Sequence, residues 1–155
     1  MARKEAEMAR LTAKDIMHPR VSVTSKEKGR DLLTKMMSGY PALPVVNDNL
    51  EVIGTVSEYN ILDAVREGKT INEFSAETIM SCGHGEHFES SCKAPVTVRT
   101  DTPIKEIIDK MYSEHLSILP VVEGKKLVGM ISRKNIINAM SEKGLWPEEE
   151  FRKRT

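Results

Sequence analysis

Long apolar runs, aromatic residues and cysteines are all scarce in this sequence. None of its hydrophobic stretches approaches the roughly 18 residues that a membrane-spanning helix requires, so we expect no membrane partner. The first 15 residues are charged and lack the apolar core of a signal peptide, which favours a cytoplasmic protein. Two cysteines in 155 residues are too few for a disulfide framework.

Neither sign of charge is in excess, because 23 basic residues balance 23 acidic ones. Binding to the phosphates of nucleic acid usually needs a basic surplus, and base stacking needs aromatic side chains, which make up only 5% of this chain. We therefore expect no nucleic-acid partner. The content of 39% hydrophobic and 30% charged residues is typical of a folded globular protein.

The chain contains the same pattern twice. RVSVTSKE at 20–27 matches PVTVRTDT at 95–102, ALPVV at 42–46 matches ILPVV at 118–122, and VIGTVSEYNIL at 52–62 matches LVGMISRKNII at 127–137. The leaders KDIM at 14–17 and ETIM at 77–80 are also alike, and about twelve additional residues follow the second leader. Matching blocks in the same order indicate a duplication.

Each copy has the residue pattern of a β-α-β-β-α unit. Short β-branched runs at 21–23 and 96–98 favour strands. Apolar residues at helical spacing follow, for example at 104–111, where Asp101 or Thr102 is expected to cap the helix. Two strands joined by a hairpin turn come next. A last helix should begin after Ser57 or Ser132 and bury one apolar stripe, which is Ile61, Leu62 and Val65 in one copy and Ile136, Ile137 and Met140 in the other.

A three-stranded sheet with helices on one face leaves its other face uncovered, and two copies can cover each other. We therefore predict an α+β fold in which two repeats pack through their sheets with pseudo-two-fold symmetry. The order of strand, helix, Leu-Pro-Val-Val, hairpin and Gly-x-x-Ser-x-x-Asn resembles the cystathionine β-synthase (CBS) domain. Two such units in tandem resemble a Bateman module.

The resemblance covers most of the chain. It places one repeat at 12–66 and a second at 75–141, which carries an inserted loop at 81–95. Residues 1–11 are expected to form an N-terminal helix or arm, and residues 142–155 a C-terminal tail. No catalytic domain remains, and no nucleophile or acid–base pair is tied to a site, so we expect no enzymatic activity.

The resemblance also implies a function. Such modules bind an adenine nucleotide (AMP, ADP or ATP), or a related adenosyl ligand, in clefts between the repeats. We therefore expect a regulatory, energy-sensing module that passes a conformational change to an unidentified effector protein. The resemblance further implies a homodimer.

The serine and asparagine of the repeated motif are the candidate ligand contacts at each helix start. These are Ser57 and Asn60 in the first copy, and Ser132 and Asn135 in the second. A helix N-terminus exposes unpaired N–H groups and favours an anion. Asparagine stands where the family has aspartate, so a neutral amide would hold the ribose. The alternative is that each serine is only a helix cap.

The adenine base is expected against the opening strand of a repeat and the chain before Leu-Pro-Val-Val. His115 and Tyr40 occupy matching positions there, where either one stacks on a ligand or only roofs the cleft. Gly54 and Gly129 would let a ligand approach the preceding strand closely. The candidate contacts in these segments are Val21, Val23, Pro41, Ala42 and Leu43, and in the second copy Val96, Val98, His115, Leu116, Ser117 and Ile118.

Charges in the first helical turn distinguish the two copies. Arg133 and Lys134 follow Ser132, where cations oppose the helix dipole by about 0.3–1 kcal/mol each, and a bound phosphate would offset that cost. Glu58 follows Ser57 and would repel phosphate. We predict that the second copy is the stronger phosphate site. The alternative is that Arg133 and Lys134 simply face solvent.

The inserted loop contains both cysteines and two histidines. Cys82, His84, His87 and Cys92 supply two thiolates and two imidazoles, a set suited to tetrahedral zinc. A disulfide between the cysteines and an unlinked loop are the other possibilities, and the sequence leaves all three open. The alternative function is thus a metal- or redox-responsive switch in this loop, with the nucleotide clefts empty.

Overall fold

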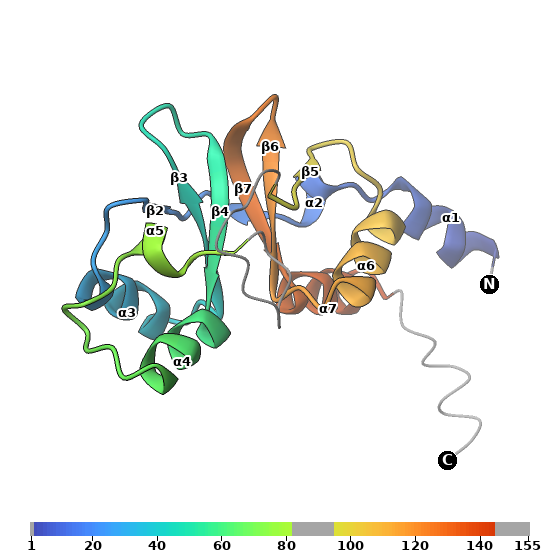
Figure 1. Ribbon diagram of the computed structural model, residues 1–155. Helices are drawn as coiled ribbons and strands as arrows, with labels where there is room; N and C mark the ends of the chain where they lie inside the picture. The colour runs from blue at the N-terminus through green and yellow to red at the C-terminus, as the bar shows by residue number, and fades with distance from the viewer. Residues whose placement is uncertain (1, 82–94, 145–155) are drawn as a thin grey trace, which may run out of the picture.

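The computed structural model of this protein describes residues 2–81 and 95–144. Its helices are α1 (Ala2–Arg10), α2 (Ala13–Ile16), α3 (Gly29–Met37), α4 (Glu58–Arg66), α5 (Ala76–Ile79), α6 (Ile104–Ser113) and α7 (Arg133–Glu142). Its strands are β1 (His18–Pro19), β2 (Val23–Thr24), β3 (Ala42–Val46), β4 (Val52–Ser57), β5 (Val98–Arg99), β6 (Ile118–Glu123) and β7 (Lys126–Ser132). Figure 1 shows the strands standing together in the middle, with helices on both flanks.

The predicted β-α-β-β-α unit is present twice. In the first repeat, β2 pairs in parallel with β3, and β3 forms an antiparallel hairpin with β4, in which Leu43 faces Val56. In the second repeat, β5, β6 and β7 pair in the same way, and Leu119 faces Ile131. The order of strands is β2-β3-β4 in one sheet and β1-β7-β6-β5 in the other.

The two sheets face each other, as the sequence predicts. Ala42 of the first repeat packs with Ile118 and Met130 of the second in one buried cluster. At the hairpin ends a second cluster contains Val46, Val52, Val122 and Leu127. Backbone hydrogen bonds also join the two hairpins, because the amide of Val52 donates to the Lys125 carbonyl at 3.2 Å and the amide of Leu127 to the Leu50 carbonyl at 2.9 Å.

The helices cover the outer faces of the sheets, but their buried stripes are narrower than the sequence pattern suggests. On α4, Asn60 and Ala64 are buried, whereas Leu62 and Val65 are 65% and 60% exposed. On α7, Ile136 is buried and Ile137 is 50% exposed. The expectation that all six residues of the two stripes are buried is therefore wrong. One side of each helix faces its sheet, and a second apolar side is left uncovered.

Each leader helix packs on the core of the other repeat. Ala13 and Ile16 of α2 belong to the core of the second repeat, together with Ile104 and Leu119. Conversely, α5 contributes to the core of the first repeat, where it joins residues such as Leu43. In Figure 1, α2 accordingly lies beside β5 and the orange strands, and α5 beside β4.

Backbone hydrogen bonds hold each leader helix against the other repeat. The amide of Ala13 donates to Thr102 at 2.9 Å, and the amide of Ile104 donates to Leu11 at 2.9 Å. In the first repeat, the amide of Ala76 likewise donates to Glu27 at 2.8 Å. The strand pairing continues the pattern, because β1 pairs with β7 of the second repeat. The two repeats are therefore linked by strand-like contacts at several places.

The N-cap of α6 is Pro103 rather than Asp101 or Thr102, because the Thr102 hydroxyl accepts a hydrogen bond from the Arg99 amide at 3.0 Å instead.

Within residues 2–81 and 95–144, no helix is both long enough and apolar enough to span a lipid bilayer.

Candidate functional site

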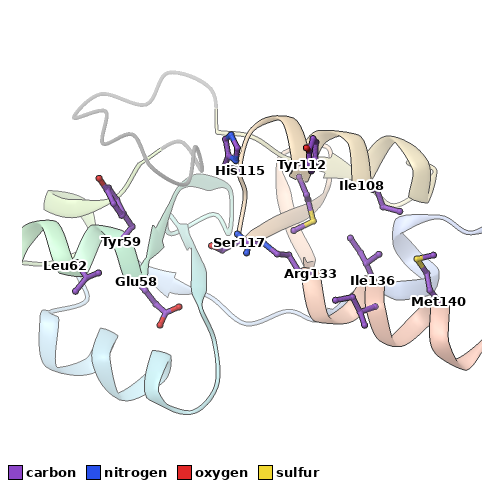
Figure 2. Close-up of a pocket in the computed structure, with 12 residues that line it drawn as sticks. Glu58, Tyr59, Leu62, Ile108, Tyr112, His115, Ser117, Arg133, Ile136 and Met140 are labelled. Carbon is purple, nitrogen blue, oxygen red and sulfur yellow. The ribbon is translucent and has the colours of Figure 1, made fainter. Parts of the chain in front are cut away.

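A groove of about 800 Å³ lies between α4 of the first repeat and α6 and α7 of the second. Its lining is largely apolar, and Figure 2 shows Tyr59 and Leu62 on one side and Tyr112 and Ile136 among the residues on the other. Polar groups gather where the two repeats meet. They are His115, Ser117, Arg133 and, from the opposite side, Glu58.

Arg133 is held in place by its own repeat. Its Nε atom donates a hydrogen bond to the carbonyl oxygen of Leu116 at 3.1 Å, and Figure 2 shows its side chain beside Ser117. The guanidinium therefore lines the groove while remaining exposed, which argues against the alternative that it only faces bulk solvent. Lys134 is exposed and is not among the groove residues.

The motif serines cap their helices, as predicted. The Ser132 hydroxyl accepts from the Asn135 amide at 3.2 Å, while Asn135 Oδ1 accepts from the Ser132 amide at 2.8 Å and from the Ser132 hydroxyl at 2.9 Å. Ser57 and Asn60 repeat this arrangement with distances of 3.3, 2.8 and 3.0 Å. Each pair forms a reciprocal capping box, which satisfies donors that a helix start otherwise leaves unpaired.

The backbone amide that follows each serine differs between the repeats. The amide of Glu58 donates to the Pro41 carbonyl at 3.0 Å. Among the described residues, no corresponding bond joins the amide of Arg133 to Ser117. The start of α7 therefore offers an anion one more N–H group than the start of α4, and it carries Arg133 where α4 carries Glu58.

His115 corresponds to Gly39 rather than to Tyr40. Both residues follow a helix C-cap and have positive φ angles, 53° at His115 and 121° at Gly39. The match between His115 and Tyr40 in the sequence is thus off by one, because α6 is one residue longer than α3. His115 is exposed and lines the groove, whereas Tyr40 is partly buried and its ring contacts His18 edge to face, with a centroid distance of 5.7 Å.

Gly54 and Gly129 do not provide space for a ligand. A Cβ atom on Gly54 would lie 2.9 Å from the Met80 sulfur and 3.0 Å from the Ser81 carbonyl oxygen. A Cβ atom on Gly129 would lie 2.6 Å from the Met17 sulfur. The expectation that a ligand approaches these glycines is therefore wrong, because the exchanged leaders already cover them.

The expected base-contacting segments are divided by the fold. Six of the residues in these segments are buried in the cores, so only their backbone groups are left to contact a ligand. The six are Val23, Ala42, Leu43, Val98, Leu116 and Ile118. Val21, Pro41 and Val96 are partly buried, and His115 and Ser117 line the groove. Ligand contact by all of these residues remains a prediction.

Sequence reasoning missed one pair of equivalent lysines. Lys35 Nζ donates to the Ser22 carbonyl at 3.2 Å, and Lys110 Nζ donates to the Thr97 carbonyl at 3.4 Å. Both bonds hold the opening segment of a repeat against its own first helix. In the first repeat alone, Glu27 adds an ion pair to Lys35 at 2.9 Å. The sequence could have indicated this pair, because Lys35 and Lys110 occupy equivalent positions in the two copies.

The expected metal ligands Cys82, His84, His87 and Cys92 lie outside the described residues. No cluster of three or more potential metal ligands occurs within the ranges that are described. The tail is described only as far as Gly144.

The sequence profile of the CBS domain matches residues 13–67 and 91–142. Among curated proteins, the chain is similar to the chloroplastic CBS domain-containing protein CBSX2 of Arabidopsis thaliana, with 27% identity over 154 residues that cover 83% of this chain and 63% of that protein. It is also 35% identical over 133 residues to the zinc metalloprotease MJ0392 of Methanocaldococcus jannaschii, covering 84% of this chain and 32% of that protein. The chain thus spans less than two thirds of the length of these relatives.

Solved structures share the fold. CBSX2 in complex with AMP superimposes with a TM-score of 0.69 and 24% identity, covering 86% of this chain and 98% of that one. The CBS domain pair of MJ0100, in complex with 5′-methylthioadenosine and S-adenosyl-L-methionine, gives a TM-score of 0.66 and 20% identity over 86% and 98% of the two chains. Hypoxic Response Protein I, with two coordinated zinc ions, gives 0.68 and 21% over 83% and 98%.

Proposed function

This chain belongs to the CBS domain family, and from that premise we propose that it is a regulatory module that binds an adenine nucleotide between its two repeats. AMP, ADP and ATP are the candidate ligands, and sensing of cellular energy in the cytoplasm is the role that such a ligand implies. The complexes of CBSX2 with AMP and of MJ0100 with adenosyl compounds support this ligand class. We propose no catalytic activity, since domain pairs of this fold are typically regulatory.

The proposal depends on one observation. The first turns of α4 and α7 both line the same groove. Glu58 and Tyr59 belong to the first turn of α4, and Arg133 opens α7. Helix N-termini attract phosphate through their free N–H groups and their dipole. The neighbouring apolar lining suits a planar base, which a few polar groups can orient.

We assign the phosphates to the start of α7 rather than α4. Arg133 brings a positive charge and fixed donors to this end, and arginine is well suited to phosphate recognition. At α4, Glu58 brings a negative charge, and its backbone amide is already bonded to Pro41. Both differences favour an anion at the second repeat.

A ligand in this groove touches both repeats, so its affinity depends on their relative arrangement. The hairpin-to-hairpin hydrogen bonds and the exchanged leaders connect the same two units. In an equilibrium between two relative arrangements of the repeats, a ligand changes the populations only by the difference between its affinities for the two arrangements. We propose that an effector protein recognises the arrangement that the ligand favours.

Thermal unfolding tests the ligand proposal directly. AMP, ADP, ATP and S-adenosylmethionine are each added at increasing concentration, with guanosine nucleotides as the control ligands. A ligand at 100 times its Kd stabilises the folded state by about 2.7 kcal/mol, which raises Tm by several degrees. Arg133→Gln should reduce the Tm shift at least several-fold, whereas Glu58→Gln should leave it unchanged or increase it. No shift with any adenosyl ligand at millimolar concentration would contradict the proposal.

We also propose that the chain forms a homodimer through the uncovered apolar side of its helices. Leu62, Val65, Tyr112 and Ile137 form this helical surface, and they are 65%, 60%, 83% and 50% exposed. They lie on α4, α6 and α7 around the same groove. Monomeric proteins rarely leave several large apolar side chains together in water, and a second copy is a partner of matching chemistry.

The second candidate function is a zinc-dependent switch in the inserted loop. It rests on the residue types of Cys82, His84, His87 and Cys92, and on the zinc ions of Hypoxic Response Protein I. Two thiolates and two imidazoles match the usual ligands of a closed structural zinc site.

A further inference from the structure

One wall of the groove, formed by α7, joins a cation to an apolar strip. Arg133 lies at the start of this wall, and Ile136 and Met140 continue it toward the end of the helix. Figure 2 shows Ile108 and Tyr112 of α6 beside them. Tyr112 is 83% exposed, so the strip is open to water. Exposed apolar patches of this kind usually mark the binding site of another apolar group.

Arg133 keeps donors for an anionic group at its end of this wall. Its Nε atom donates to the Leu116 carbonyl, and among the described residues its terminal nitrogens make no hydrogen bond or ion pair. A guanidinium has five N–H donors, so most of them remain available. Glu58 on the opposite wall disfavours an anion on that side. Between Met140 and Arg133, the groove therefore suits an apolar group followed by an anionic one.

The end of α7 leads the chain to this same groove. The helix ends at Glu142, and Gly144 follows with a φ of 61°. The Gly144 amide donates to the Ser141 carbonyl at 3.2 Å, which is the bond of a helix end that reverses the chain. In such an end, the residue after the glycine commonly packs on the third residue from the end of the helix, which here is Met140. Any chain that follows Gly144 therefore starts at the apolar end of the groove.

The sequence that follows has the composition that this groove suits. Leu145 and Trp146 are apolar, and the three glutamates at 148–150 come next, before Phe151. Pro147 favours an extended backbone at the residue before it. We propose that residues 145–151, here called the tail segment, dock in the groove of their own chain.

The reach of the tail segment matches the length of the wall. At about 1.5 Å per residue, Met140 lies roughly 10 Å along α7 from Arg133. An extended chain advances about 3.3 Å per residue, so a segment that starts at Met140 with Leu145 brings residues 148 and 149 to Arg133. The aromatic side chain of Trp146 then covers the strip, and a carboxylate pairs with the guanidinium. Leu62 and Val65 of α4 remain available to a second copy.

Docking of the tail segment would regulate the site, and this part of the inference rests on the proposed function. The carboxylates occupy the start of α7, where we assign the phosphates of the nucleotide. A segment attached by a short linker has an effective concentration of order millimolar, so it docks without a partner. A nucleotide then binds only the undocked fraction of the protein. If the tail segment is docked about nine tenths of the time, the apparent affinity for the nucleotide is weakened about tenfold.

Trp146 is the only tryptophan of the chain, so its fluorescence reports docking in the full-length protein. Without nucleotide, its emission should be blue-shifted relative to the protein unfolded in urea, and its quenching by acrylamide should be several-fold weaker. Met140→Gln should reverse both effects, because it removes the apolar contact at the start of the segment. Met37→Gln is the matched control, since Met37 also lies on a helix but is 85% exposed and does not line the groove. Unfolding in urea confirms that both variants are folded.

Added AMP tests the competition. It should displace the tail segment and shift the Trp146 emission to the red in the wild-type protein. In isothermal titration, full-length Trp146→Ala should bind AMP about tenfold more tightly than the wild type, because the docked state is lost. Lys153→Ala lies beyond the tail segment and should leave the AMP affinity unchanged.

The possible results separate this inference from the proposed function. Emission as red as that of the unfolded protein, without nucleotide, would overturn the docking. Emission that turns blue only as the protein concentration rises would assign the groove to a second copy and overturn docking within one chain. Equal AMP affinities of wild type and Trp146→Ala would overturn the competition and leave the proposed function standing. If no adenosyl compound binds either protein, the proposed function and the competition fall, while a blue-shifted emission that Met140→Gln abolishes would still establish the docking.

Discussion

The sulfur of Met17 lies 2.6 Å from the point that a Cβ atom on Gly129 would occupy. Met17 belongs to the leader of the first repeat, and Gly129 to a strand of the second. The glycine is therefore required by the crossing of one repeat onto the other. Met80 and Gly54 show the same relationship in the opposite direction, with 2.9 Å between the corresponding points.

Gly129→Ala should destabilise the protein by about 1–3 kcal/mol, because the new methyl group overlaps the Met17 side chain and the nearby His18 carbonyl. Denaturation in urea measures the change in the free energy of unfolding. Met17→Ala, which removes one of the two obstacles, is the matched background. The double variant should lose less unfolding free energy than the sum of the losses in the two single variants. A strictly additive result would mean that Met17 and Gly129 do not contact each other in solution.

His115→Gly should stabilise the fold, because a residue with a Cβ atom is strained at a φ of 53°. The relief of roughly 1–2 kcal/mol is partly offset by the greater backbone freedom of glycine in the unfolded chain. Thermal unfolding without ligand measures the effect. Gly39→Ala is the mirror experiment at the equivalent position, with φ 121°, and should destabilise. A loss of stability in His115→Gly would show that the histidine side chain makes contacts that outweigh its strain.

Lys35→Met should cost more stability than Lys110→Met. Both substitutions remove a hydrogen bond to an opening segment, but only Lys35→Met leaves a carboxylate, that of Glu27, without its partner. The Glu27 side chain is only 15% exposed, so its unpaired charge adds about 1–3 kcal/mol to the loss. Glu27→Gln in the Lys35→Met background should recover part of it. Equal losses from the two lysine variants would rule out a role for Glu27.

Leu62→Glu should convert a dimer to a monomer if the helical surface joins two copies, because it places a charge in the middle of an apolar contact. Sedimentation velocity at several concentrations measures the mass. Leu50→Glu is the control, since Leu50 is also exposed but lies in the β3–β4 turn, away from this surface. A dimer that persists in Leu62→Glu would exclude this surface, and a wild-type monomer would exclude the homodimer itself.

A zinc site in the inserted loop predicts about one zinc ion per chain in protein purified without chelator. Elemental analysis by mass spectrometry measures it, and Cys82→Ser should lose the metal without loss of AMP binding. Cys82 and Cys92 joined by a disulfide would instead change electrophoretic mobility on reduction. Protein with neither zinc nor a mobility change would exclude both forms of switch.

Much of the site was predictable because its residues act locally. Ser132 directly precedes a helical stretch, and serine is a preferred N-cap residue, so its capping role follows from the sequence alone. The charge difference between Glu58 and Arg133 was equally visible. By contrast, the part that Asn60 and Asn135 take in the caps could be seen only from the hydrogen bonds that their Oδ1 atoms accept. The exposed side of α4 could be seen only once the structure showed which helical face meets the sheet.

The sequence by itself determined the two β-α-β-β-α repeats and the packing of their sheets, because alternation, helical spacing and turn residues are properties of neighbouring positions. Only the tertiary structure decided which repeat each leader helix joins. The leaders at 14–17 and 77–80 end in the same apolar pair, Ile-Met, so either core could accept either one on its apolar residues alone. What settles the choice is the path of the chain between the sheets, where β1 pairs with β7 and Ser81 pairs with Thr55. Hydrogen bonds between segments that are distant in sequence leave no periodic mark in either segment.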